Sequence, residues 1–114
     1  MTTWRWRGLA TLALMAGVGV PVAAQDAAKV ARGREVYQEL RCQTCHAIAG
    51  AGNRRYPLDG VGAKLTEEQI RKWIVSPREM NPGVRKRAYD NVPADKLEAL
   101  VAYMLSLKPS GGPR

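Results

Sequence analysis

Apolar residues recur every three or four positions in three stretches of the chain, which is the spacing of one face of an α-helix. The predicted helices cover roughly residues 26–41, 66–76 and 93–108. Alternation of apolar and polar residues, the pattern of a half-buried strand, does not mark any segment convincingly. The intervening segments, residues 47–64 and 77–92, are long for loops in a small domain. The pattern therefore predicts an all-α fold with about three main helices and two long loops.

Two local signals refine these helices. Thr66 and Gln69 fit a capping box at the start of the second helix, and Pro77 ends that helix one or two residues earlier. Gly33 lies in the middle of the first helix, where glycine costs roughly 1 kcal/mol relative to alanine. Glycine at such a position permits another backbone to approach closely. We therefore expect a second helix to cross the first one at Gly33.

The first twenty-four residues differ from the rest of the chain. Arg5 and Arg7 precede an uncharged stretch over residues 9–20, which is followed by small residues at 22–24. This order is typical of a secretory signal peptide, and the apolar stretch is shorter than the roughly 20 residues of a spanning helix. We expect a signal peptide over residues 1–24 and a domain over 25–114, exported to the periplasm, with no stable membrane span after cleavage. The alternative is an uncleaved N-terminal anchor.

The composition restricts the chemistry further. The chain has 114 residues, a formal net charge of +8, two cysteines and one histidine. This length allows one domain, and two cysteines are too few for a miniprotein built on disulfides. The basic charge of an exported protein does not indicate nucleic-acid binding. A mature domain this small builds only a modest core, and such domains often rely on a metal or a cofactor.

The two cysteines and the histidine stand together as Cys42, Cys45 and His46, in the pattern C-x-x-C-H. This is the signature of covalent c-type haem attachment. Two thiols three residues apart can reach the porphyrin vinyl groups, and the adjacent histidine supplies an axial nitrogen to the iron. A thioredoxin-like motif, a zinc site and a Cys42–Cys45 disulfide are the alternatives. The first lacks a preceding strand, and the second has only three nearby ligands.

Residues from about Ala31 to Lys108 resemble a small class I c-type cytochrome with one haem. Gly33, Tyr37 and the C-x-x-C-H motif resemble the family's first helix and haem site. The resemblance implies a cytochrome c-like fold around one covalently bound haem c, with His46 as an axial ligand. It also implies that the carbonyl of Pro57 accepts a hydrogen bond from His46, although Tyr56 stands where the family usually has glycine.

The resemblance implies a methionine as the sixth iron ligand, and here the sequence departs from the family. Lys86 stands where that methionine is expected after Pro82-Gly83, and Met80 lies six positions earlier. The iron is bound by Met80 through a shifted loop, by Lys86 through a neutral amine, or by neither, in which case the site is open. Deprotonating a lysine at neutral pH costs about 4.6 kcal/mol, which an iron–amine bond can offset.

The predicted function is one-electron transfer rather than enzymatic catalysis, because the sequence shows no nucleophile–base pair and no paired carboxylates. The alternatives are a haem subunit of an exported dehydrogenase and a haem sensor with an open or lysine-ligated sixth site. If the loops frame the haem edge, the basic residues in and near them favour redox partners with an acidic docking surface. These residues are Arg54, Arg55, Arg71, Lys72, Arg78, Arg85, Lys86 and Arg87.

Overall fold

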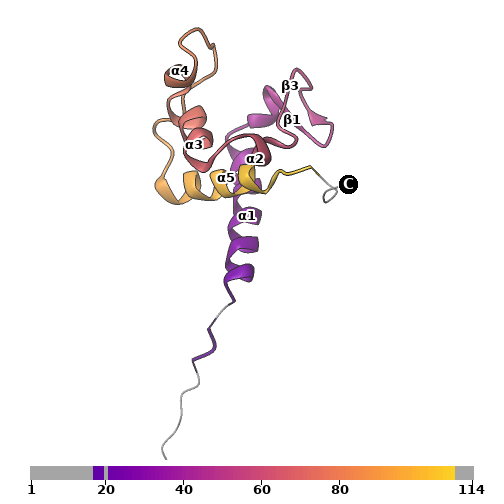
Figure 1. Cartoon of the computed structure of the whole chain (residues 1–114), viewed down its shortest axis with the longest axis vertical. Coiled ribbons are helices and arrows are strands. Elements are labelled where there is room, and N and C mark those ends of the chain that lie inside the picture. Colours follow the sequence, from indigo (N-terminus) through magenta and orange to yellow (C-terminus); the bar gives the residue numbers. More distant parts are fainter. Residues whose placement is uncertain (1–16, 20, 110–114) are drawn as a thin grey trace, which may run out of the picture.

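A computed structural model describes residues 17–19 and 21–109 of the chain. Its three main helices are α1 (Val22–Glu39), α3 (Glu67–Val75) and α5 (Ala94–Ser106), as Figure 1 shows. All three overlap the predicted stretches, so the mainly helical character of the fold is confirmed. The segments between them contain shorter elements: the 3₁₀-helix η1 (Cys42–Thr44), β1 (His46–Ile48), β2 (Ala51–Gly52), β3 (Tyr56–Pro57), α2 (Val61–Lys64) and α4 (Pro77–Met80).

The predicted absence of a sheet is wrong. The three strands form one small sheet in the order β2-β1-β3, with β1 antiparallel to β2 and parallel to β3. Strands of two or three residues are too short to show an alternating pattern, so the sequence gives no sign of them. The first of the two predicted loops therefore contains a folded sheet and the short helix α2, and the second contains α4.

The ends of the first helix also differ from the prediction. Helix α1 begins at Val22 rather than near residue 26, and it ends at Glu39, two residues earlier than expected. Arg41 adopts a left-handed conformation with φ 58°, which ends the helical path just before the cysteine motif. Residues 1–16 and 20 of the predicted signal peptide lie outside the described residues.

Helix α3 begins as the sequence predicts. The side chain of Thr66 accepts a hydrogen bond from the amide of Gln69 at 3.2 Å, and the Gln69 side chain accepts one from the amide of Thr66 at 2.9 Å. The capping box is confirmed because it depends only on residues within one turn.

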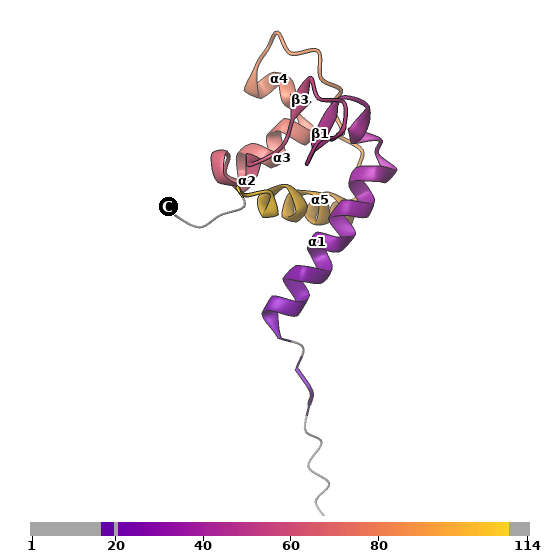
Figure 2. The same cartoon turned by 90° about the vertical axis from the view of Figure 1, so that its right-hand side faces the viewer.

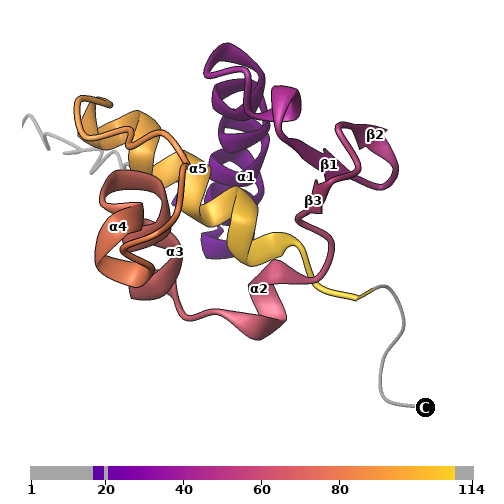
Figure 3. The ribbon, with the colours of Figure 1, turned by 90° about the horizontal axis from the view of Figure 1, so that it is seen from above.

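Helices α1 and α5 cross closely, as Figures 2 and 3 show from two directions. A Cβ atom on Gly33 would lie 2.0 Å from the carbonyl oxygen of Ala99, so only glycine allows this approach. The rings of Tyr37 and Tyr103 meet edge to face beside the crossing, with their centroids 5.8 Å apart. The close approach predicted at Gly33 is therefore confirmed, and α5 is the element that makes it.

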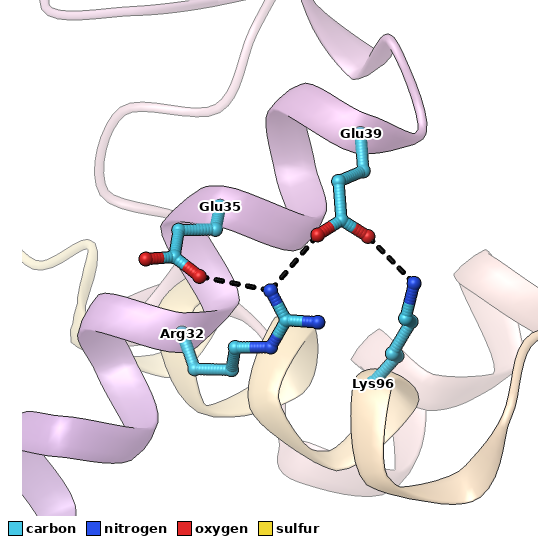
Figure 4. Close-up of polar contacts among 4 residues, drawn as sticks. All are labelled: Arg32, Glu35, Glu39 and Lys96. Atoms are coloured by element: carbon cyan, nitrogen blue, oxygen red, sulfur yellow. Dashed lines mark hydrogen bonds and ion pairs between the residues drawn. The ribbon is translucent and has the colours of Figure 1, made fainter.

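A polar network lies on the outer side of this crossing (Figure 4). Arg32 donates to Glu35 and Glu39 at 2.8 Å each, and Lys96 of α5 donates to Glu39 at 2.7 Å. The bonds from Lys96 and Arg32 lower the pKa of the Glu39 carboxyl. Because these groups are largely exposed, the network fixes the relative position of the helices more than it stabilises the fold.

The hydrophobic core lies between α1, α3 and α5. Its buried members are Val36, Tyr37, Ile70, Ile74, Leu100, Val101, Tyr103 and Met104. In Figure 3, the sheet lies on one side of the crossing helices and α3 and α4 lie on the other. The sheet, which follows the cysteine motif, and the pair α3–α4 therefore lie on opposite sides of the α1–α5 crossing.

Candidate functional site

The C-x-x-C-H motif occupies one tight turn directly after α1. Helix η1 begins at Cys42, the amide of Cys45 donates to the Cys42 carbonyl at 3.1 Å, and His46 starts β1. Both cysteines are free thiols; Cys42 is half-buried and Cys45 is exposed. Burial raises the pKa of the Cys42 thiol, and the positive charge of Lys86 opposes this shift. The turn therefore brings two free thiols and one imidazole together.

A single hydrogen bond fixes the ring of His46. Its Nδ1 lies 2.9 Å from the carbonyl oxygen of Tyr56. A carbonyl can only accept, so Nδ1 carries the proton and donates it, and Nε2 keeps its lone pair. This is the arrangement of a histidine that binds a metal through Nε2 while a backbone carbonyl orients the ring.

The carbonyl that accepts this bond belongs to Tyr56, whereas the sequence predicted that of Pro57. The parallel pairing of β1 with β3 sets this register, because it aligns His46 with Tyr56 and Ala47 with Pro57. The amide of Leu58 then donates to the carbonyl of Ala47 at 2.8 Å, which continues the pairing. A backbone carbonyl has no side-chain signature, so the correct residue depends on a strand register that the sequence does not reveal.

Tyr89 connects residues 81–92, which we call the distal segment, to both sides of the fold. This residue was not singled out from the sequence. Its amide donates to the carbonyl of Ile74 at the end of α3 at 2.9 Å. Its hydroxyl donates to the carbonyl of Leu40, two residues before Cys42, at 3.3 Å. The only available signal was an aromatic residue within a polar segment. These two bonds hold the distal segment against the cysteine motif.

Lys86 lies on this same segment, close to the motif. Its Nζ donates to the carbonyl of Arg87 at 3.1 Å and lies 5.1 Å from the centre of the Tyr89 ring. Burial lowers the pKa of the Lys86 amine, and the sulfurs of Cys42 and Cys45 partly oppose this effect. Lys86 is therefore a half-buried cation on the segment that Tyr89 connects to the cysteine motif, rather than a member of a fully solvated basic run.

Met80 lies at the end of α4 and is half-buried. The amide of Asn81 donates to the carbonyl of Pro77 at 3.0 Å and closes this short helix. The carbonyl of Asn81 then accepts from the amide of Val84 at 3.0 Å, while its side chain accepts from the amide of Gly83 at 3.1 Å. A hydrogen-bonded turn thus separates Met80 from Lys86.

Six of the eight predicted basic residues fall into two groups, and the other two, Arg54 and Arg55, are exposed between β2 and β3. Arg71 is paired with Glu67 and Glu98, and Lys72 with Glu68, so their charges are partly neutralised. The second group lies around a hollow of about 520 Å³ beside α4, whose lining includes Arg78, Arg85, Lys86 and Arg87. We call Arg78, Arg85 and Arg87 the basic rim, and all three are exposed.

The family described as cytochrome c oxidase, cbb3-type, subunit III, matches residues 28–104. This match covers well over half of the chain, which therefore belongs to that family of c-type cytochrome domains and binds haem c with its iron. Cytochrome c oxidase subunit 2 of Alkalihalophilus pseudofirmus is 31% identical over 86 residues, which cover 68% of this chain and 25% of that protein. The chain thus spans about a quarter of the length of this relative. No solved structure matches it significantly.

The residues present fit this cofactor. Two free thiols and an imidazole whose Nε2 keeps its lone pair form the donor set of a haem c site. Ile48 and Leu58 follow the motif as half-buried apolar side chains packed against the core, as the edge of an apolar macrocycle requires. Across residues 17–19 and 21–109, no cluster of three His, Cys, Asp or Glu side chains forms a separate metal site. No helix in the same ranges is long and apolar enough to span a membrane.

Proposed function

We propose that this chain is an exported monohaem c-type cytochrome that carries one electron at a time between redox partners in the periplasm. The sulfurs of Cys42 and Cys45 hold the haem, and Nε2 of His46 binds its iron. The bound haem supplies the one-electron chemistry by alternating between ferric and ferrous iron. The observation that carries this proposal is the 2.9 Å bond from His46 Nδ1 to Tyr56, beside two free thiols.

Each residue of the site has a defined part in this function. The Tyr56 carbonyl fixes the proton on Nδ1 and orients the His46 ring, so that Nε2 would be the nitrogen that binds the iron. The close crossing of α1 and α5 holds the motif on a rigid support, which limits the structural change when the electron arrives. The proposed function includes no proton transfer between a side chain and a substrate, as for a carrier rather than an enzyme.

An optical redox titration of the full-length chain, expressed in a host that attaches haem to c-type cytochromes, tests this function. We expect one reversible transition with the slope of a single-electron couple, and the same curve in the oxidative and reductive directions. Two resolved transitions would contradict a single haem. An irreversible change on reduction would contradict a carrier.

The basic rim is proposed to steer the protein toward acidic partners. Its exposed arginines attract an acidic docking surface over a distance that salt shortens. With an acidic redox protein as acceptor, we expect the bimolecular rate of electron transfer to fall steadily as ionic strength rises. The double variant Arg85→Glu/Arg87→Glu is expected to slow the reaction at low salt and to flatten this dependence.

Lys29→Glu on the first half of α1 is the matched control, since it reverses one exposed charge outside the basic rim. It is expected to keep most of the wild-type rate and salt dependence. Equal effects of the Lys29 and rim variants, after scaling for the number of charges, would show that net charge alone sets the rate.

The similarity to cytochrome c oxidase subunit 2 supports a second candidate function. Cytochrome c oxidase subunit 2 names a component of a larger enzyme, so the present domain is also a candidate haem subunit that passes electrons within a complex. Gel filtration of a gently prepared cell extract distinguishes the two functions by the size at which the protein elutes. A free carrier elutes at the size of one small domain, whereas a subunit elutes with its complex.

A further inference from the structure

Resting on the proposed haem site, we propose that Lys86, as a neutral amine, is the axial ligand that binds the iron opposite His46. Met80 is then a residue of the α4 end and not a ligand.

The path of the segment places Lys86 at the motif. Tyr89, three residues later, is bonded to Leu40 through its hydroxyl and to Ile74 through its amide. The Lys86 Nζ lies over the ring of this same tyrosine, with 5.1 Å between the nitrogen and the ring centre. Because Leu40 lies two residues before Cys42, these contacts hold the amine near the haem-attachment turn.

The surroundings of the amine suit a ligand better than a surface cation. Lys72 and Lys96 pair with Glu68 and Glu39, as lysines near carboxylates ordinarily do. Within the described residues, no carboxylate lies within ion-pair distance of the Lys86 Nζ. Its contacts are the Arg87 carbonyl and the Tyr89 ring, and burial lowers its pKa. A half-buried amine without a counter-charge gives up its proton more readily than an exposed one.

The turn at Asn81 keeps Met80 apart from this place. The side chain and carbonyl of Asn81 accept hydrogen bonds from Gly83 and Val84, and its amide is bonded to Pro77. For the Met80 sulfur to take the place of the Lys86 amine, α4 and this turn would have to give up these bonds. Lys86 would have to give up only its bond to the Arg87 carbonyl, because its side chain already lies over the ring of Tyr89.

The binding step is balanced without an oxidant or a reductant. The Lys86 ammonium releases one proton to solvent, and the nitrogen lone pair then forms the bond to the iron, with no electron transferred. Deprotonation opposes binding by about 4.6 kcal/mol for an exposed lysine at neutral pH, and burial reduces this penalty.

The test compares ferric and ferrous spectra and reduction potentials of the holoprotein with those of three variants. The wild type is expected to be six-coordinate and to lack the thioether–iron charge-transfer band. Lys86→Met is expected to gain that band and to show a higher potential, because a thioether favours the reduced iron. Lys86→Arg keeps the charge but has a guanidinium that cannot lose its proton, so its ferrous form is expected to bind carbon monoxide rapidly.

Met80→Leu is the matched control and is expected to keep the wild-type spectrum and potential. A wild-type thioether band that disappears in Met80→Leu would overturn the proposal in favour of Met80. Rapid binding of carbon monoxide by the wild type, unchanged in Lys86→Arg, would overturn it in favour of an open site. Wild-type protein without covalent haem would overturn the proposed function together with this inference, whereas the other two results leave that function standing.

Discussion

The double variant Cys42→Ser/Cys45→Ser is expected to lose covalently attached haem entirely. Each sulfur provides one of the two bonds that fix the porphyrin to the chain, and serine oxygen does not replace them. Each single variant keeps one thiol beside His46 and is expected to retain a reduced amount of attached haem. A haem stain after denaturing electrophoresis measures this directly, because only covalently bound haem remains with the chain.

Thr44→Ala is the control for this experiment, since it changes an exposed residue inside the same turn without removing a sulfur. It is expected to attach haem at the wild-type level. Immunoblotting of the same samples separates loss of haem from loss of protein. Haem that stays on the double variant through denaturation would contradict attachment at this motif.

Gly33→Ala is expected to destabilise the folded protein by about 3 kcal/mol or more, since overpacking ordinarily costs 1–3 kcal/mol and a backbone clash cannot be relieved by a side-chain shift. The added Cβ would lie 2.0 Å from the Ala99 carbonyl oxygen and 2.6 Å from the Tyr103 Cβ. Helices α1 and α5 would therefore have to separate. Urea unfolding of the holoprotein, followed by circular dichroism, measures the change in the free energy of unfolding.

Gly83→Ala supplies the comparison, because the nearest atom to its added Cβ is 3.6 Å away and its φ is not positive. Its effect on the free energy of unfolding is expected to stay within about 0.5 kcal/mol. The sign of the Gly33 result is informative, since helix propensity alone favours alanine by about 1 kcal/mol. A stabilised Gly33→Ala protein would mean that the two helices do not cross closely.

The parts of the fold that follow from local sequence were predictable. The capping box at Thr66 and Gln69 starts α3, and the apolar stripe of the last helix includes Leu100, Val101 and Met104, which are buried in α5. Gly33, a glycine in the middle of a helix, indicated a close crossing with another helix. The small sheet was not predictable, because its strands have two or three residues and are specified by pairing with one another.

The candidate site divides in the same way. Cys42, Cys45 and His46 lie within one stretch of five residues, so their juxtaposition in one turn follows from the sequence. The carbonyl that orients His46 depends on the register between β1 and β3, and the prediction missed it by one residue. The sixth ligand depends on the path of a segment fixed by Tyr89 through contacts as far as 49 residues away in sequence. Spacing alone therefore left Met80, Lys86 and an open site as alternatives.

The intact mass of the purified, exported protein tests the central claim most directly. If the chain is a monohaem c-type cytochrome, the mass equals that of residues 25–114 plus one haem, because thioether formation adds the cofactor without loss of atoms. The mass of the chain alone would contradict haem attachment. A mass two hydrogens lower than the chain alone would show that Cys42 and Cys45 form a disulfide instead.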